Sequence, residues 1–84
     1  MAKYRVSVIV RMREDLPEPQ GIALEKVLKR MGYKEISDIR VGKILEMNVE
    51  GDNKEKVVET ITNLSNDLFS NPVIENFELK VMEL

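Results

Sequence analysis

The 84-residue chain contains no cysteine and no histidine, and both absences restrict its chemistry. Without histidine it lacks the side chain that most often acts as a general base near neutral pH, and without cysteine it lacks a thiol nucleophile. These two residues are also the usual zinc ligands. Disulfide bonds are excluded, which is consistent with a reducing compartment. Because no histidine is present to activate a serine, a Ser-His-Asp triad is impossible.

Aromatic residues and surplus positive charge are also scarce. The chain has two Tyr, two Phe and no Trp, and its 13 basic and 15 acidic residues give a net charge of −2. Nucleic-acid-binding proteins usually carry a patch of basic residues and aromatic side chains on which bases stack, so this composition disfavours a nucleic-acid partner. The first residues lack a signal-peptide core, and no apolar run approaches the roughly 20 residues that span a bilayer. We therefore expect a cytoplasmic protein with no membrane partner.

The length indicates a single domain, residues 1–84. A domain of this size buries only about 60–65% of its unfolded surface, so its own stability is modest and oligomerisation would add to it. The spacing of apolar residues alternates along the chain between that of strands and that of helices, in the order β-α-β-α-β. Residues 3–12 alternate as a strand with one wet face, and residues 73–84 form the last strand. Helices are expected from Pro19 to Gly32 and from about Asp52 to Ser70.

The first predicted helix carries an apolar stripe of residues spaced for one face, namely Leu24, Val27, Leu28 and Met31. The second carries a similar stripe of Val57, Ile61, Leu64 and Leu68. Each stripe requires a surface to cover it. The sequence therefore predicts an α+β fold in which two helices lie on one face of a mainly antiparallel sheet.

The segment from residue 36 to residue 50 alternates in one unbroken phase and is unusually long for a strand. Fully extended it would reach about 50 Å, against about 17–20 Å for a typical strand. A two-residue hairpin at Gly42 and Lys43 would reverse the apolar pattern and is disfavoured. Two arrangements keep the pattern: one long strand bent at Gly42, or two strands joined by a three-residue loop. The second gives the ferredoxin-like order β-α-β-β-α-β.

We favour the uncut strand, because it keeps the pattern without a turn. Half of such a strand would overhang its own small sheet and pair with a second chain. The fold class expected is thus β-α-β-α-β, related to ferredoxin-like, with a long bent second strand shared between protomers. That arrangement indicates a subunit rather than a self-sufficient enzyme.

Two short stretches are candidate partner-binding sites. At Gln20 and Gly21 a helix begins, and its free backbone N–H groups can hold an anion or a partner's carboxylate, although ordinary helix entry explains the same residues. Gly42 inside a strand marks a bend or a close backbone approach, and Arg40 and Lys43 flank it. This stretch is interpreted either as a solvated bend or as a protein contact in which Arg40 and Lys43 set the register.

No catalytic, cofactor-binding or metal site is expected in the chain. Four carboxylates invite a metal or acid–base role: Glu55, Glu59, Glu75 and Glu78. Glu55 and Glu59 lie one helical turn apart on a face that also carries lysines, which is typical of a solvated surface. The single glycines match no phosphate-binding motif. From the residues alone, the chain is a small non-catalytic α+β module that self-associates.

The order and spacing of several stretches resemble the PurS family, the small subunits of phosphoribosylformylglycinamidine (FGAM) synthase. The stretches are YRVSVIV at 4–10, Pro19-Gln20-Gly21, Leu24-Glu25, Met31-Gly32-Tyr33, residues 39–43, and the closing Asn71-Pro72-Val73-Ile74-Glu75. They cover essentially the whole chain. One departure is Glu18, where the family usually has Asp; the charge is kept.

The resemblance implies a role in de novo purine synthesis. PurS-like proteins are dimers that bridge a glutaminase subunit and an ATP-dependent synthetase subunit, and they help ammonia pass between the two. ATP and magnesium are used by the synthetase subunit, so no cofactor is expected on this chain. The family is described as having a long second strand that links protomers. Contact surfaces are implied near Gln20, Gly21, Arg40, Gly42 and Lys43.

An alternative is a ferredoxin-like regulatory domain in which paired protomers hold an amino acid or a nucleotide at their interface. Stabilisation by such small molecules in a thermal shift experiment would favour this alternative. Capture of a glutaminase and a synthetase would favour the PurS-like role.

Overall fold

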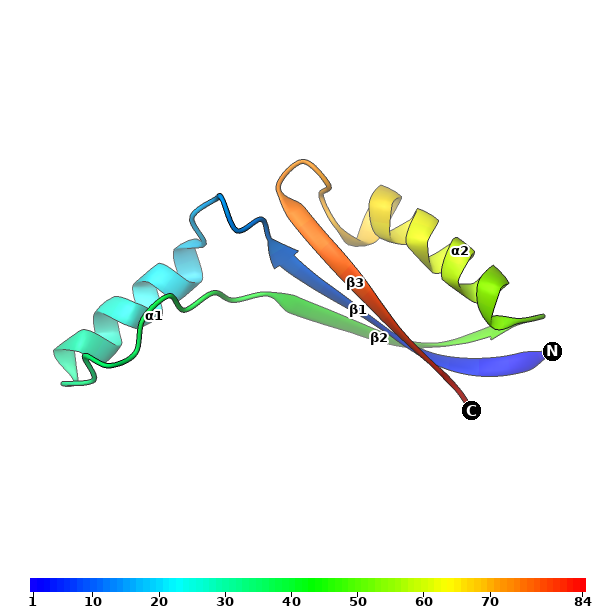
Figure 1. Ribbon diagram of the computed structural model, residues 1–84, viewed down its shortest axis with the longest axis horizontal. Coiled ribbons are helices and arrows are strands. Elements are labelled where there is room, and N and C mark those ends of the chain that lie inside the picture. The colour runs from blue at the N-terminus through cyan, green and yellow to red at the C-terminus, as the bar shows by residue number, and fades with distance from the viewer.

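The computed structural model describes residues 1–84 and contains a three-stranded antiparallel sheet and two α-helices (Figure 1). The elements are, in chain order, β1 (Ala2–Met12), α1 (Pro19–Arg30), β2 (Lys43–Gly51), α2 (Lys54–Leu64), the π-helical turn η1 (Ser65–Phe69) and β3 (Glu75–Glu83). The predicted order and the α+β class are confirmed. Neither helix has the length and apolar character needed to cross a membrane.

The N-terminal strand β1 is the centre of the sheet, which has the order β2-β1-β3. It pairs antiparallel with β2 from Ala2 opposite Gly51 to Val10 opposite Lys43. On its other side it pairs antiparallel with β3, from Tyr4 to Met12. Because β1 has a partner on both sides, β2 and β3 each keep one unpaired edge.

The core lies between the inward face of β1 and α2. It consists of six buried apolar residues: Tyr4, Val6, Val8, Val10, Val57 and Ile61. Only 9 of the 84 residues are buried, because one helix alone covers the sheet. Asn53 begins α2, and its side-chain oxygen accepts a hydrogen bond from the N–H of Lys56 at 2.8 Å.

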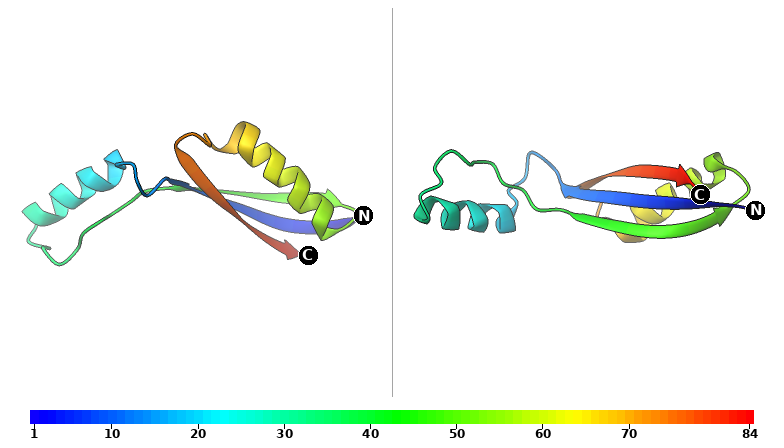
Figure 2. Two further views of the ribbon diagram at one scale, coloured as in Figure 1. Left: turned by 45° about the horizontal axis from the view of Figure 1, so that its top comes forward. Right: turned by 90° about the horizontal axis from the view of Figure 1, so that it is seen from below.

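The prediction that both helices lie on one face of the sheet is wrong for α1. In Figure 1 and in both views of Figure 2, α1 stands beyond the end of the sheet, whereas α2 lies beside the strands, and its Val57 and Ile61 are part of the core. The apolar stripe of α1 is accordingly exposed, with Leu24 at 48%, Val27 at 41% and Met31 at 64%. The physical reason is that the connections on both sides of α1 continue outward past the last strand pairs. We call residues 13–42, which comprise α1 and these connections, the arm.

The prediction of a single strand from residue 36 to residue 50 is also wrong. β2 begins only at Lys43, where its pairing with Val10 begins. Residues 36–42 lie past that point and have no strand beside them, so no ladder forms, and Asp38 has a left-handed backbone with φ of 55°. They do not fold back as a hairpin either. The chain leads from the arm directly into β2, so neither the long bent strand nor the alternative of two strands joined by a three-residue loop is formed.

Candidate protein-contact site at the base of the arm

The arm leaves the sheet at residue 13 and returns at residue 42, so its two connections meet at its base. Arg40 ties them together: its Nη2 donates to the carbonyl oxygens of Arg13 at 2.9 Å and Leu16 at 2.6 Å. The N–H of Arg13 in turn donates to the carbonyl of Ile74 at 2.8 Å, next to β3. Arg40 therefore holds the base of the arm through hydrogen bonds within its own chain.

Glu18 makes the second tie across the base. Its carboxylate accepts from the N–H groups of Gln20 at 3.0 Å, Gly21 at 2.6 Å and Val41 at 2.9 Å, and the residue is only 7% exposed. The first two bonds cap α1, and the third reaches the segment before β2. The sequence suggested that the backbone N–H groups of Gln20 and Gly21 could hold an external anion. In the structure these groups donate to the carboxylate of Glu18 instead.

The pKa of Glu18 lies below its ordinary value. The largest cause is the hydrogen bond from the Val41 N–H; those from Gly21 and Gln20 and the positive charge of Arg40 act in the same direction, and burial opposes them. Glu18 is therefore ionised at neutral pH, and its charge faces the positive end of the α1 dipole. We call Glu18, Gly21, Arg40 and Val41 the clasp.

Two glycines allow the backbones at the base to approach closely. A methyl group at Gly21 would overlap the carbonyl group of Ile39, so α1 begins directly against the returning chain. A methyl group at Gly42 would lie 2.5 Å from the carbonyl oxygen of Val10. The neighbouring backbone that Gly42 admits is therefore β1 of the same chain.

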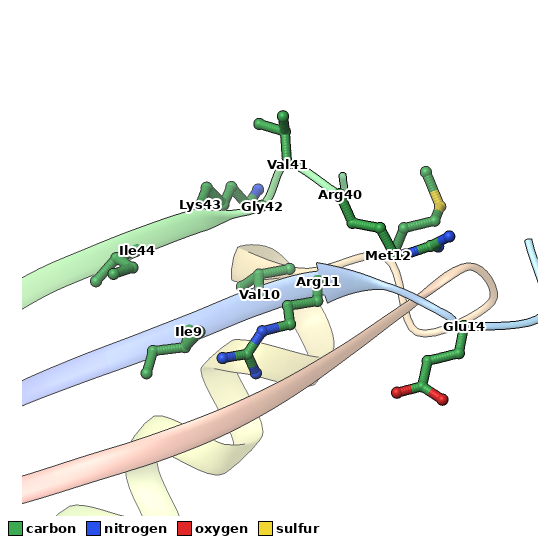
Figure 3. Close-up of a pocket in the computed structure, with 10 residues that line it drawn as sticks. All are labelled: Ile9, Val10, Arg11, Met12, Glu14, Arg40, Val41, Gly42, Lys43 and Ile44. Atoms are coloured by element: carbon green, nitrogen blue, oxygen red, sulfur yellow. The ribbon is translucent and has the colours of Figure 1, made fainter. Parts of the chain in front are cut away.

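Beside the clasp lies a hollow of about 310 Å³ (Figure 3). It is lined by the last residues of β1, the first residues of β2 and the arm connections that adjoin them: Ile9, Val10, Arg11, Met12, Glu14, Arg40, Val41, Gly42, Lys43 and Ile44. Arg11 is engaged by Glu78 at 3.2 Å, whereas the exposed Lys43 forms no ion pair. An adjoining hollow of about 250 Å³ shares Gly42 and Lys43 and includes Gln20.

The structure thus gathers all five predicted residues at the base of the arm, although they differ in accessibility. Gln20, Arg40, Gly42 and Lys43 line the two hollows, while Gly21 is buried beneath them. Whether they contact a partner stays a prediction. Sequence reasoning missed Glu18 as the organising residue. Its signal was a carboxylate directly before Pro19 at a helix start, where a side-chain acceptor caps the first turn.

Comparison with known proteins places the whole chain in one family. Residues 5–83 match the family model described as PurS: Phosphoribosylformylglycinamidine (FGAM) synthase. The FGAM synthase subunit PurS of Bacillus subtilis is 33% identical over 81 residues, which cover 96% of this chain and 95% of that relative.

Two solved structures have the same fold over nearly the whole chain. Methanocaldococcus jannaschii PurS, described as one of the subunits of formylglycinamide ribonucleotide amidotransferase in the purine biosynthetic pathway, superposes with a TM-score of 0.86 at 26% identity, covering 96% of this chain and 98% of that one. A chain of the Thermotoga maritima PurLQS structure superposes with a TM-score of 0.83 at 32% identity over 100% of both. With the family model covering nearly its full length, this chain belongs to the PurS family of FGAM synthase subunits.

Proposed function

We propose that this chain, a PurS subunit of FGAM synthase in purine biosynthesis, performs no chemistry itself and bridges the glutaminase and ATP-dependent synthetase subunits. The observation that carries the proposal is the full-length match, at 32% identity, to a chain of the structure described as PurLQS from Thermotoga maritima. By this proposal, glutamine, ATP and magnesium are bound by the other two subunits. This subunit keeps them in the relative position that lets ammonia pass from one to the other.

The side chains of this subunit support a structural role. Its one buried carboxylate, Glu18, is committed to three backbone N–H groups and is not free to take a proton from a substrate. The exposed carboxylates of Glu46 and Glu78 are paired with Arg5 and Arg11 across the outward face of the sheet. The surface around these pairs is available for contacts with other proteins.

The base of the arm is the surface we propose for an enzyme subunit. Lys43 carries an exposed and unpaired charge beside the two hollows, where a partner's carboxylate can reach it. Arg40 acts indirectly, since its guanidinium holds the shape of that surface. Gln20 and Gly42 complete the rim.

We also propose that the chain forms a homo-oligomer, a dimer or a tetramer, through the region of the predicted long second strand. The unpaired edge of β2 and the unpartnered segment before it support this proposal.

Reconstitution of the enzyme tests the bridging role. Amidine formation is measured with glutamine and, separately, with ammonium salts as the nitrogen source, in mixtures of the glutaminase and synthetase with and without this subunit. We expect omission of the subunit to abolish most of the glutamine-dependent reaction and to leave the ammonium-dependent reaction, because the ATP site lies on the synthetase.

The matched control is the subunit alone with glutamine and with ATP, which should release neither ammonia nor phosphate. Equal glutamine-dependent rates with and without the subunit would contradict the bridging role. Stabilisation of the isolated subunit by amino acids or nucleotides, together with no effect on the coupled reaction, would favour the regulatory alternative instead.

A further inference from the structure

The outer edge of β3 is unpaired along its whole length. β3 forms one border of the sheet, with β1 on its inner side and no strand beyond it (Figure 2). Its nine residues make this edge about 26 Å long, at about 3.3 Å per residue. The self-association proposed above uses the opposite border of the sheet, that of β2, so the β3 edge remains available to a different partner.

The hydrogen bonds at the two ends of β3 show which of its backbone groups point away from the sheet. The N–H of Leu84 donates to the carbonyl of Lys3, and the N–H of Arg13 donates to the carbonyl of Ile74, each at 2.8 Å. Both bonds continue the β1–β3 register, in which bonded and non-bonded pairs alternate, so the even-numbered residues of β3 bond to β1. The odd-numbered residues direct their N–H and carbonyl groups outward: Phe77, Leu79 and Val81.

Glu75, another odd-numbered residue, agrees with this assignment. Its N–H donates to the carbonyl of Asn71 at 2.8 Å, in the turn before β3, and not to β1. No backbone group of a loop or turn bonds in this way to the three outward N–H groups further along the strand. These groups are therefore free to pair with a strand from another molecule.

The side chains along the edge are suited to an added strand. Phe77, Leu79 and Val81 point toward α2, pack against the core and remain half-buried, so a neighbouring strand with apolar side chains would complete their burial. Proteins usually guard such an edge with a bulge, a proline or a short strand. β3 has none of these, since its register with β1 is continuous and its nine residues include no proline.

The end of the edge at Glu83 is negatively charged. The pKa of Tyr4 is raised, chiefly by its burial and then by the negative charges of Glu83 and Glu55, so both carboxylates lie near the same hydroxyl group. Both carboxylates are exposed, and neither forms an ion pair within the chain. A strand that pairs here gains from a basic residue at this end.

We propose that the β3 edge binds an extended segment of an enzyme subunit, which joins the sheet as a fourth strand and places a Lys or Arg beside Glu83 and Glu55. The added strand alternates apolar residues on the α2 side with polar residues on the other side. A second copy of β3 is a poorer occupant. Two β3 edges paired symmetrically about Leu79 would set Glu75 opposite Glu83 at both ends.

The proposal rests on the bridging role, because a bridge needs two separate docking surfaces. The base of the arm offers the positive charge of Lys43 to an acidic surface, whereas the β3 edge offers carboxylates to a basic segment. The segment therefore belongs to the enzyme subunit that does not dock at the base of the arm.

Hydrogen exchange, followed residue by residue by NMR, tests the added strand on the unmodified protein. In the isolated subunit the odd-numbered N–H groups of residues 77–81 should exchange rapidly, and the even-numbered groups, which bond to β1, are the internal control. The glutaminase and the synthetase are then added separately and together. We expect exchange of the odd-numbered groups to slow by more than about 10-fold with one enzyme subunit and in the complete complex.

A pair of variants at Val81 tests the same contact by affinity. Val81→Pro removes an N–H that faces outward and should leave the ladder with β1 in place, while Val81→Ala is the matched control that keeps the N–H. We expect Val81→Pro to raise the Kd for one enzyme subunit by about 10-fold relative to Val81→Ala. Glu83→Lys should weaken the same complex, whereas Asp67→Lys, an equal charge change on an exposed residue of η1, should not.

Three results would overturn the added strand. They are unchanged exchange of the odd-numbered groups in the complete complex, slow exchange of these groups already in the isolated subunit, and equal affinities of Val81→Pro and Val81→Ala. None of them would affect the bridging role, which is measured by the glutamine-dependent reaction. Loss of that role would instead appear as equal glutamine-dependent rates with and without the subunit, and it would remove the basis of this proposal as well.

Discussion

A single carboxylate, that of Glu18, joins the start of α1 to the chain that returns to β2. Its three backbone hydrogen bonds span positions 20 to 41, so one side chain controls both the helix cap and the direction of the arm. An aspartate at this position would have one methylene less and could retain the cap at Gln20 and Gly21 more easily than the bond to Val41. The longer side chain is therefore suited to the double contact.

Protonation of Glu18 should weaken the base of the arm. The folded-state pKa is below the ordinary value, so the stabilisation is fully present above the unfolded-state pKa of about 4.3 and is lost as the pH falls through the folded-state pKa. Thermal melts of wild type and Glu18→Gln from pH 7 to pH 2 measure this. We expect the wild-type advantage in Tm to be constant near neutrality and to shrink below about pH 4. An advantage independent of pH over this range would contradict the role of the charge.

Glycine is required at position 21 for packing rather than for backbone freedom. Gly21→Ala should lower the free energy of unfolding by about 3 kcal/mol, the upper part of the usual cost of overpacking, because the backbone of Ile39 must move. Gly32→Ala is a matched control, because Gly32 has φ of 96° but open space around it. This substitution should lower the free energy of unfolding by only about 1 kcal/mol, which is the cost of placing alanine in the left-handed backbone conformation. Urea unfolding at one protein concentration compares them, and equal losses would contradict the close approach at Gly21.

At the scale of elements, the sequence predicts well which helices and strands exist and in what order. It predicts less well where each of them lies in the molecule. The strand pattern of β1 and the inward positions Val57 and Ile61 of α2 are found as expected. Leu64 and Leu68 were expected on the same stripe, but both are exposed, and Ser65 is buried instead. The π-helical turn η1 begins at Ser65 and follows a different helical period, and no sequence pattern marked it.

The location of α1 shows why pattern alone could not place it. Leu24, Val27 and Met31 predict an apolar face correctly, but periodicity does not say whether the covering surface belongs to the same chain. Likewise, the alternation across residues 36–50 is compatible with a strand, whereas a ladder needs a neighbour that this chain does not supply beyond Lys43. The five candidate contact residues come from two separate stretches of sequence and meet at the base of the arm because each lies at an element boundary; their contact with a partner stays a prediction.

The two cations beside β2 should behave differently when reversed. Arg40→Glu removes two hydrogen bonds to carbonyl groups and should lower the free energy of unfolding by about 1–2 kcal/mol. Lys43→Glu should change it by less than about 0.5 kcal/mol, since Lys43 is exposed and unpaired, yet weaken the glutamine-dependent reaction with the enzyme subunits. Urea unfolding and the coupled assay separate the two effects. A Lys43→Glu variant with full coupled activity would exclude this residue from the docking surface.

At the scale of the whole molecule, the extents of 53 × 27 × 14 Å describe a thin and elongated body with a small core. A chain of this shape is expected to gain much of its stability from association. The Tm should therefore rise with protein concentration, which is measured by melts over a hundredfold concentration series, and sedimentation should show a dimer or tetramer at micromolar concentration. A Tm independent of concentration, with a monomer in sedimentation, would contradict self-association.

The central position of β1 has a consequence for how the protein is made. β1 needs partners at residues 43–51 and 75–83, so one side of the sheet cannot form until β3 has been synthesised. Pairings so distant in sequence slow folding, and until β3 has been made one edge of β1 has no partner. The sheet is therefore completed long after β1 has been made, and a partly made chain that still lacks β3 is expected to be prone to aggregation through the unpaired edge of β1.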